Sequence, residues 1–403
     1  MNTYDLVVTG AQLWLPEQSP FTALAVGGGR ILALGTDAEI LSEAGPDTQH
    51  IDAAGRAVLP GFTDAHVHPL AGGRALLGCD LETEHSRGGY ARLIRASAQT
   101  AGEWVVGSGW FGDVFPGGLP TAEELDALVP DRPAVMTSHD SHGVWVNSRA
   151  MQLAGISRDS HDPPAGRIVR DGRGEPTGVL FDTAGELVTR LIPPASKTDM
   201  RAALLCAQQH LFSLGITGWH DAILGAYLTL QDSVPTYIDL LASRELRGRV
   251  SGSLWWSPGD GPDRLPEMLR RIRAVRDAGF AVSSIKIMQD GICENCTAAL
   301  LEPYDGVHPE VRGDSVIAPD DLAEITAGLD AQGLRVHFHG VGDRAVRECL
   351  DAVEHARQMN GAGQPHQIAH LDVVDPADFP RFKALGVTAN LQPLWARDDQ
   401  GDS

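Results

Sequence analysis

Two histidines separated by one residue, His66 and His68, stand in the stretch VLPGFTDAHVHP. The apolar residues before them predict a β-strand, and residues two apart on a strand project from the same face. Imidazole nitrogens on one face can bind a single metal ion, and zinc accepts such ligands. Two of the 15 histidines could also take this spacing by chance. The pair is therefore a hypothesis for a zinc site that needs further ligands.

Three more histidines lie at the ends of predicted strands, His337 and His339 in LRVHFHG and His370 in QIAHLD. Imidazole suits zinc and other borderline cations, so these positions are candidates for the missing ligands. His337 and His339 share a strand face, so periodicity leaves open which of them binds the metal. We choose His339 and His370 as ligands. His337 is then a core residue or a partner of a ligand.

Lys286 lies in the apolar strand pattern SSIKIMQD, and only three of the 32 basic residues are lysines. Burial of an unpaired ammonium is costly and lowers the lysine pKa, whereas a guanidinium stays charged. A neutral amine can react with carbon dioxide to give a carbamate, an anionic ligand that could bridge two metal ions. The alternative is an ion-paired lysine at a strand end. Lys286 is therefore the most informative residue after the histidine pair.

The predicted secondary structure around these residues differs between two parts of the chain. Short strand patterns separated by Gly, Pro and Asp fill residues 5–60, which predicts a small β-rich domain over 1–58. Strand and helix patterns alternate from residue 59 to 403, as expected of a parallel α/β barrel with its site at the carboxyl ends of the strands. The expected strands of this series are 57–66, 133–140, 215–222, 249–256, 283–290, 334–340, 367–372 and 386–393. Extra strand patterns near residues 104 and 170 indicate an elaborated insertion at about 85–200.

Composition limits the class of partner. A formal net charge of −21 argues against a nucleic acid, whose binding draws on clustered Lys and Arg. No segment approaches the roughly 18 to 20 apolar residues of a membrane span, and the first residues lack a secretory pattern. We expect a cytoplasmic protein with a small-molecule substrate, and a homo-oligomer is left open. The single CxxC pair, Cys293 and Cys296, lacks a second ligand pair and is interpreted as ordinary thiols.

Seven stretches of the chain resemble the amidohydrolase superfamily of metal-dependent hydrolases, in the branch of N-substituted formamide deformylase. They include GFTDAHVHP (61–69), SIKIMQDG (284–291), VHFHGVGDRAV (336–346) and IAHLDVVDPADFPRFKALGVTANLQP (368–393). The resemblance covers nearly all of residues 1–395. It implies a (β/α)₈ TIM barrel, a small β-sandwich built from both chain ends, and a centre of one or two zinc ions, with another divalent metal left open.

The resemblance also implies roles for single residues. Carried over position by position, it assigns the metal ligands, with Lys286 carboxylated; they are His66, His68, Lys286, His339 and His370. It places four further residues near the substrate: Trp110, His139 and His142 in the insertion, and Asp290 beside the lysine strand. Ordinary loop packing is an equal alternative for these four.

The end of the sequence departs from the family pattern. The family uses an aspartate at the end of the eighth barrel strand to bind metal and move the proton, and then returns to the β-sandwich. Asp398 and Asp399 follow the strand at 386–393 too closely to belong to an eighth strand, so the catalytic residue stays unassigned. We expect the C-terminal part of the barrel and of the sandwich to be missing.

Together these features predict hydrolysis of a carbon–nitrogen bond in a small non-peptide amide, by attack of a zinc-bound hydroxide. One alternative is a truncated, catalytically impaired metal-binding scaffold that needs another chain. A second alternative is a deaminase or cyclic amidase on the same fold. It ranks lower because the His and Glu arrangement of such deaminases is not found in the sequence.

Overall fold

The computed structural model describes residues 4–14, 20–100, 102–139, 143–163, 166–227, 231–293, 296–304 and 311–392. Internal contacts divide the chain into two units, Met1–Phe62 and Thr63–Ser403, and each is described by itself. Within the described ranges, no helix is both long enough and apolar enough to cross a membrane.

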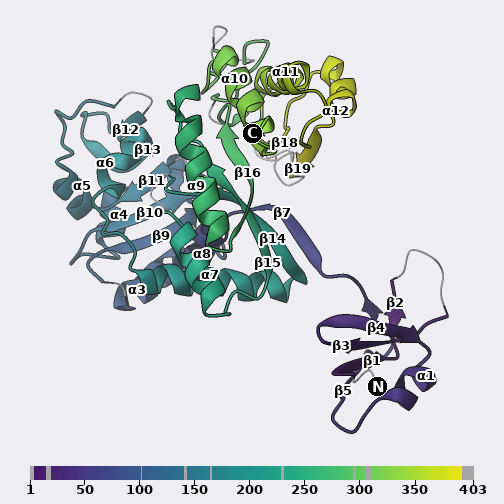
Figure 1. Ribbon diagram of the computed structural model, residues 1–403. Helices are drawn as coiled ribbons and strands as arrows, with labels where there is room; N and C mark the ends of the chain where they lie inside the picture. The colour runs from purple at the N-terminus through teal and green to yellow at the C-terminus, as the bar shows by residue number, and fades with distance from the viewer. Residues whose placement is uncertain are drawn as a thin grey trace. The chain divides into compact units, whose positions relative to one another are not determined.

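The first unit is β-rich, as its strand patterns predict, and is drawn in purple in Figure 1. Its elements are β1 (Leu6–Thr9), β2 (Gln12–Leu13), β3 (Ala23–Gly27), β4 (Arg30–Gly35), α1 (Asp37–Glu43), β5 (Gln49–Asp52) and β6 (Ala57–Val58). One sheet has the order β4-β3-β1-β5, and β2 pairs with β6. Gly28 and Gly29 form the two-residue turn between β3 and β4 with φ of +57° and +73°, a conformation that favours glycine. Val7 on β1, Ala25 on β3 and Ile40 on α1 are buried together in the core of this unit.

The second unit contains a seven-stranded sheet in the order β19-β18-β17-β16-β15-β14-β7. Its strands are β7 (Phe62–Val67), β14 (Ile216–Leu224), β15 (Arg249–Trp255), β16 (Ala281–Met288), β17 (Arg335–Gly340), β18 (Gln367–His370) and β19 (Thr388–Leu391). The pairs from β14 to β19 are all parallel. The carboxyl ends of these strands therefore meet at one end of the sheet.

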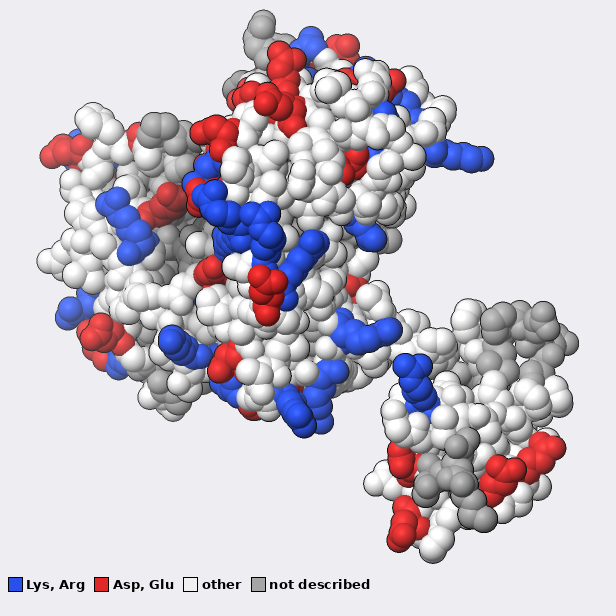
Figure 2. All heavy atoms as spheres, viewed as in Figure 1, with Lys and Arg blue, Asp and Glu red and all other residues white. Residues whose placement is uncertain are grey.

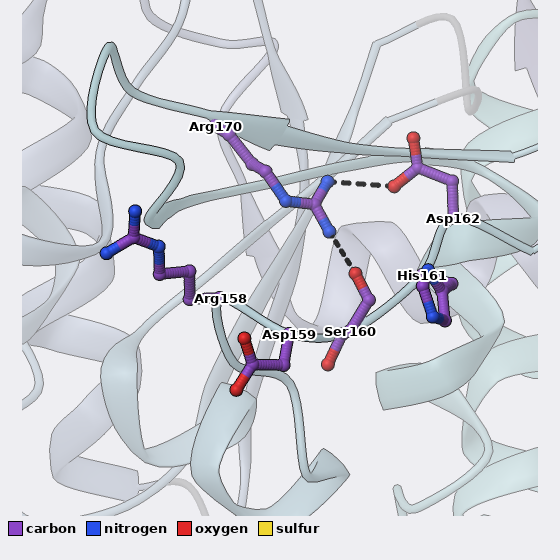
Figure 3. A pocket seen from close by; sticks show the side chains of 6 residues that line it. All are labelled: Arg158, Asp159, Ser160, His161, Asp162 and Arg170. Atoms are coloured by element: carbon purple, nitrogen blue, oxygen red, sulfur yellow. Dashed lines mark hydrogen bonds and ion pairs between the residues drawn. The ribbon is translucent and has the colours of Figure 1, made fainter.

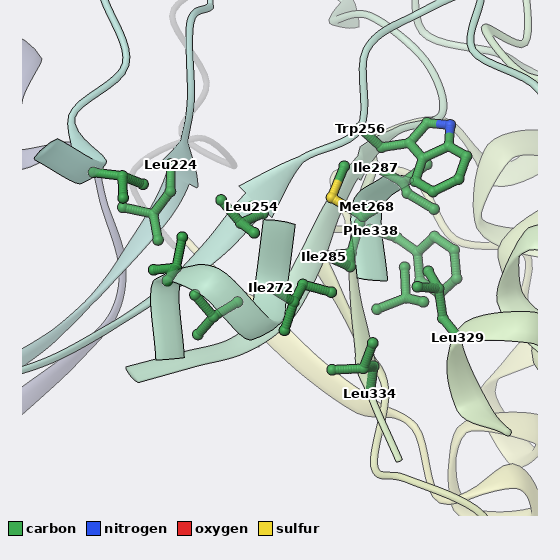
Figure 4. Packing of buried hydrophobic residues seen from close by; sticks show 14 of the residues in the cluster. Leu224, Leu254, Trp256, Met268, Ile272, Ile285, Ile287, Leu329, Leu334 and Phe338 are labelled. Carbon is green, nitrogen blue, oxygen red and sulfur yellow. The ribbon is translucent and has the colours of Figure 1, made fainter. Parts of the chain in front are cut away.

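Helices connect the strands of this sheet and cover its outer face (Figure 1). The helical elements are α7 (Lys197–Ser213), α8 (Val234–Ala242), η3 (Pro262–Arg264), α9 (Leu265–Asp277), α10 (Pro319–Asp330), α11 (Asp343–Asn360), η5 (Pro376–Asp378) and α12 (Phe379–Leu385). Figure 4 shows Leu254, Ile285 and Phe338 from the strands against Ile272 and Leu329 from the helices. Since these apolar residues face the helices, their polar neighbours on each strand face the interior of the sheet.

The first and last strands of the sheet approach each other. Asn390 on β19 donates a hydrogen bond from Nδ2 to the carbonyl oxygen of Ala65 on β7, with a separation of 3.3 Å. The sheet is therefore nearly closed and barrel-like, which confirms the predicted α/β class.

A six-stranded sheet in the order β12-β13-β11-β10-β9-β8 lies between β7 and β14 in the sequence. Its strands are β8 (Cys79–Asp80), β9 (Val105–Trp110), β10 (Ala134–Ser138), β11 (Gly143–Val146), β12 (Gly166–Arg170) and β13 (Pro176–Asp182). The helical elements of this region are α2 (Pro69–Leu77), α3 (Arg87–Thr100), η1 (Gly112–Val114), η2 (Pro116–Gly118), α4 (Ala122–Asp126), α5 (Ser148–Ala154) and α6 (Thr183–Thr189). The expectation that 133–140 belongs to the barrel series is wrong, because β10 pairs with β9 and β11 of this second sheet.

Basic side chains gather over α9 in Figure 2, although the whole chain carries a net charge of −21. Some of these basic side chains form contacts within the fold. Arg271 forms an ion pair with Asp232 at 2.7 Å, and Arg276 donates to the carbonyl oxygen of Val282 at 2.7 Å. These contacts fix α9 to the segments that follow β14 and begin β16.

Candidate metal centre

The four histidines predicted as ligands meet at the carboxyl ends of three strands. His66 lies on β7, His68 directly follows it, His339 lies on β17, and His370 ends β18. The ring centroid of His66 is 5.3 Å from that of His68 and 5.0 Å from that of His370, while His339 and His370 are 4.4 Å apart. Residues more than 300 positions apart thus form one group of imidazoles.

Lys286 on β16 belongs to the same region. Its neighbours Ile285 and Ile287 pack into the core under the helices, so alternation turns Lys286 to the interior face. The residue is 1% exposed, and among the described residues its Nζ has no hydrogen-bond partner. Burial lowers the pKa of Lys286 to about 7, so a large fraction of the amine is neutral near neutral pH.

The structure separates the two histidines that periodicity could not. His339 lies 3.0 Å from the carbonyl oxygen of Gly291 through Nε2, which must therefore carry the hydrogen and leaves the lone pair on Nδ1. A metal-binding histidine commonly donates its other ring N–H in this way. His337 lies deeper, is fully buried, and has Nε2 at 2.9 Å from His66 Nδ1 and Nδ1 at 2.8 Å from Gln367 Nε2. Both of its ring nitrogens face protein atoms.

His370 reaches the group through an unusual backbone. In register, Ala369 pairs with His339, so regular alternation would turn His370 to the opposite face. His370 and Leu371 instead have φ of +81° and +61°, the left-handed region that residues with a Cβ rarely adopt. A hydrogen bond of 2.9 Å from the His370 N–H to Gln392 Oε1 supports this conformation. Strain of this kind persists where the surrounding structure over-determines it, often at functional sites.

Polar side chains missed by the sequence reasoning lie beneath the histidines. His220 on β14 contacts Ser251 Oγ through Nδ1 at 2.9 Å and Ser253 Oγ through Nε2 at 2.8 Å. Ser253 Oγ also lies 2.7 Å from Ser284 Oγ, and the His220 ring stacks on His337 at 5.5 Å. Serines that alternate with apolar residues in 249–256 and 283–290 were the signal for an interior polar layer.

Asp290 lies in the loop after β16 and is fully buried. Its carboxylate accepts backbone hydrogen bonds from Val341 at 3.0 Å, Gly342 at 2.8 Å and Ala299 at 3.0 Å. Burial nevertheless raises the pKa of Asp290 to about 7. These contacts tie its loop to the turn that follows His339, so the carboxylate holds the backbone beside the histidine group.

The other predicted substrate residues lie in the second sheet. Trp110 is buried and donates from Nε1 to the carbonyl oxygen of Met136 at 2.8 Å. His139 is exposed, and its ring stacks on Phe111 with centroids 4.2 Å apart. His142 lies outside the described residues, as do Asp398 and Asp399. Trp110 thus supports the insertion core, and His139 lies at its surface.

The donor set at the carboxyl ends fits a divalent cation. Imidazole nitrogens are common zinc ligands, and the unpartnered amine of Lys286 is a buried polar atom that a carbamate–metal bond would satisfy. Within the described ranges, no three His, Cys, Asp or Glu side chains already surround a common point as metal ligands. His66 Nδ1 is in contact with His337 Nε2, so Nε2 is the His66 ring nitrogen that could bind a metal.

An open pocket of about 550 Å³ lies elsewhere, in the insertion beside β12 (Figure 3). It is lined by Arg158, Asp159, Ser160, His161, Asp162 and Arg170. Arg170 pairs with Asp162 at 2.9 Å and donates to the carbonyl oxygen of Ser160. The pocket holds none of the predicted site residues.

The fold defines a class before any relative is considered: an α/β barrel-like protein with ionisable residues at the carboxyl ends of its strands. A solved structure of this class, an uncharacterized metal-dependent hydrolase from Pyrococcus furiosus, is similar to it with a TM-score of 0.71. The two share 24% sequence identity over 96% of this chain and 77% of that one. At this identity the likeness shows the fold.

The particular family follows from the sequence comparisons. The Amidohydrolase family profile matches residues 49–401, and the chain belongs to this family. It is 30% identical to the protein LONG AFTER FAR-RED 3 of Arabidopsis thaliana, over 98% of this chain and 69% of that protein. It is 25% identical to N-substituted formamide deformylase of Arthrobacter pascens, over 96% of this chain and 73% of the deformylase. Amidohydrolases are enzymes of hydrolysis, which confirms the predicted enzyme class.

Proposed function

We propose that this protein is a metal-dependent amidohydrolase that cleaves the carbon–nitrogen bond of a small, non-peptide amide. The observation that carries the proposal is Lys286, a buried amine without a partner among the described residues, beside four converging histidines. Membership of the amidohydrolase family and the likeness to a formamide deformylase support the bond that is cleaved. N-substituted formamides are the first substrates to test, because of this likeness, and acylated amino acids are the second.

The proposed ligands for one or two zinc ions, or another divalent metal, are His66, His68, Lys286, His339 and His370. The neutral Lys286 amine would attack carbon dioxide, form a nitrogen–carbon bond and lose a proton, which gives an anionic carbamate. The depressed pKa of Lys286 favours this step because an ammonium has no lone pair to donate. His339 is preferred over His337 as the ligand because its Nε2 hydrogen bond to Gly291 leaves Nδ1 as the basic nitrogen.

When bound, the metal would supply an activated water and polarise the substrate carbonyl. The protein's own residues would hold that metal in place. Asp290 would anchor the loops beside His339 through its three backbone hydrogen bonds. The residue that moves the proton to the leaving amine is not assigned.

The proposal extends to the domain organisation and the cellular compartment of this enzyme. Residues 59–403 would belong to a (β/α)₈ barrel, of which the described residues form seven strands, and residues 1–58 to a small β-sandwich. All five cysteines are thiols rather than disulfides, which suits the cytoplasm.

Metal analysis of the purified full chain, combined with turnover assays on N-substituted formamides and acylated amino acids, tests the proposal. We expect one or two zinc ions per chain and release of amine. Zinc without turnover on any amide would favour a metal-binding scaffold instead. Absence of bound metal after incubation with zinc would refute the metal centre.

Lys286→Ala isolates the carbamate. We expect this variant to lose most of its metal and to recover part of it with added bicarbonate or short carboxylic acids, which replace the missing anion. Lys383→Ala, at an exposed lysine on α12, is the matched control and should keep wild-type metal content. An unchanged metal content in Lys286→Ala would disprove the ligand role.

A further inference from the structure

A chain of hydrogen bonds runs from β18 through β17 to the first histidine of the pair on β7. Gln367 Nε2 lies 2.8 Å from His337 Nδ1, and His337 Nε2 lies 2.9 Å from His66 Nδ1. Gln367 and His337 are also register partners on adjacent strands, so the sheet itself fixes their contact. The three side chains therefore form one connected unit beneath the metal centre.

The ring of His337, in the middle of this unit, is held in place by neighbouring side chains. His337 is fully buried, and His220 stacks on it with centroids 5.5 Å apart and planes 24° from parallel. Both nitrogens of His220 contact serine hydroxyls, and Ser253 Oγ lies 3.5 Å from His337 Nδ1. His337 thus has little freedom to turn, and its hydrogen bonds to the two neighbours keep their geometry.

The direction of donation along this unit has a chemical consequence. If the Gln367 amide donates to His337 Nδ1, His337 carries its hydrogen on Nε2 and donates to His66 Nδ1. A neutral His66 then carries its own hydrogen on Nε2 and has no lone pair there for a metal. If His337 instead donates from Nδ1, its Nε2 accepts from His66 Nδ1, and the His66 Nε2 lone pair is available.

We propose that Gln367 is a positioning residue that selects between these two directions through His337, and so decides whether His66 presents Nε2 to a metal. The inference rests on the proposed function, because it requires His66 to be a metal ligand. In the first of the two directions Gln367 presents its NH₂ group to His337 Nδ1, which is the 2.8 Å contact seen in the structure. In the metal-binding direction the amide turns about its last bond and presents its oxygen to His337 Nδ1.

Substitutions at Gln367 test the proposal because they change the hydrogen-bonding capacity of this side chain while keeping its size. Gln367→Glu replaces the amide by a carboxylate that can only accept, which fixes the metal-binding direction. We expect its dissociation constant for Zn²⁺ to fall about three- to ten-fold, since partners of metal-binding histidines change affinity by about 10- to 100-fold when removed. Gln367→Leu keeps the size without the acceptor, and we expect its dissociation constant to rise about ten-fold.

The experiment uses the full chain, stripped of metal with a chelator and titrated with Zn²⁺ against a chromophoric competitor. The absorption spectrum of the Co²⁺ form reports the ligand geometry without any substrate. Gln332→Glu is the matched control, because this exposed glutamine before β17 undergoes the same charge change outside the hydrogen-bonded unit of Gln367, His337 and His66. His337→Phe should weaken Zn²⁺ binding by about 10- to 100-fold.

The outcomes separate the two claims. A wild-type chain that binds no Zn²⁺ overturns the proposed function and this inference with it. A wild-type chain that binds Zn²⁺ while Gln367→Glu binds no more tightly than wild type overturns only the positioning role. The two Gln367 variants decide the matter even where His337→Phe fails to fold, since circular dichroism identifies which variants remain native.

Discussion

Two buried histidines flank the same strand, β18, and their surroundings differ completely. His366 precedes the strand, and its ring contacts Asp330 Oδ1 at 3.0 Å and the backbone N–H of Val336 at 2.9 Å. His370 ends the strand in a left-handed conformation, 4.4 Å from the ring of His339 and beside a lysine whose amine has no partner in the described part of the chain. Burial of a histidine alone therefore does not indicate a function; the distribution of its partners does.

The first of these histidines, His366, belongs to a network of hydrogen bonds and ion pairs around Asp330, at the amino ends of β17 and β18. We call it the amino-end network. The carboxylate accepts from Arg357 at 3.1 Å, from Asn360 at 3.2 Å and from the backbone of Gln364 at 2.9 Å, besides its contact with His366. Burial alone would raise the pKa of Asp330, but these hydrogen bonds and nearby positive charges lower it. The carboxyl-end group consists of His66, His68, Lys286, His339 and His370; Asp290 Oδ1 lies 3.7 Å from His339 Nε2, and the Lys286 amine has no hydrogen-bond partner among the described residues. The amino end of the barrel thus carries a network of paired charges, whereas the carboxyl end carries the residues proposed to bind a cation.

The largest expected effect tests the amino-end network. Asp330→Ala leaves Arg357 and His366 without their buried anion, and we expect a loss of about 3 to 5 kcal/mol in the free energy of unfolding. Chemical denaturation monitored by circular dichroism measures it. Metal content per folded molecule should stay at the wild-type value. A large loss of metal in the folded variant would contradict the division between the two ends.

Lys286→Met should increase the free energy of unfolding of the metal-free protein, whereas Asp330→Ala should decrease it. The pKa of Lys286 falls from 10.5 to about 7 on folding, so the unfolded chain takes up a proton first as the pH decreases. Wild-type stability should therefore decrease from about pH 10 to pH 7 and then level off, and the methionine variant should lack this slope. We expect the variant to be more stable by about 2 to 4 kcal/mol at pH 7 and below. Identical slopes for the two proteins would show that Lys286 is not buried as an isolated amine.

Gly363→Ala probes how tightly the amino-end network is packed. A Cβ at this position would lie 2.2 Å from Asp330 Oδ1 and 2.3 Å from Arg357 Nη1. We expect a loss of about 1 to 3 kcal/mol in the free energy of unfolding from overpacking. Gly88→Ala on α3, where a Cβ meets nothing within 4 Å, is the control and should be neutral or slightly stabilising. Equal effects in the two variants would mean that the network tolerates expansion.

Asn390→Ala has the smallest expected effect and concerns the approach of β19 to β7. The lost hydrogen bond to the carbonyl oxygen of Ala65 should cost about 1 kcal/mol, measured by thermal unfolding. Because Ala65 precedes His66, Zn²⁺ affinity should also fall a few-fold. Thr388→Ala, at an exposed position on the same strand, should change neither quantity. An affinity change without a stability change would place the effect on the metal centre alone.

Much of this arrangement could be predicted from the sequence. The spacing of His66 and His68, the lysine in an apolar strand, and the alternation of strands and helices are local patterns, and local patterns report which face a residue occupies. They predicted the α/β class, the carboxyl-end location and the histidines that meet there. They failed for 133–140, because a strand pattern is the same whether the strand joins the barrel or the second sheet.

The sequence by itself determined which residues could do chemistry, since residue type and spacing fix donor atoms and strand faces. Only the tertiary structure showed how their surroundings differ. His337 and His339 have the same period, and their difference lies in contacts with Gln367 and Gly291, which are distant in the chain. His370 joins the group against its alternation because a left-handed backbone, supported by Gln392, turns it inward. The alternation of residues along one strand determines which face of the sheet a side chain occupies. Contacts with residues from other segments determine which ring nitrogen of a histidine could bind a metal.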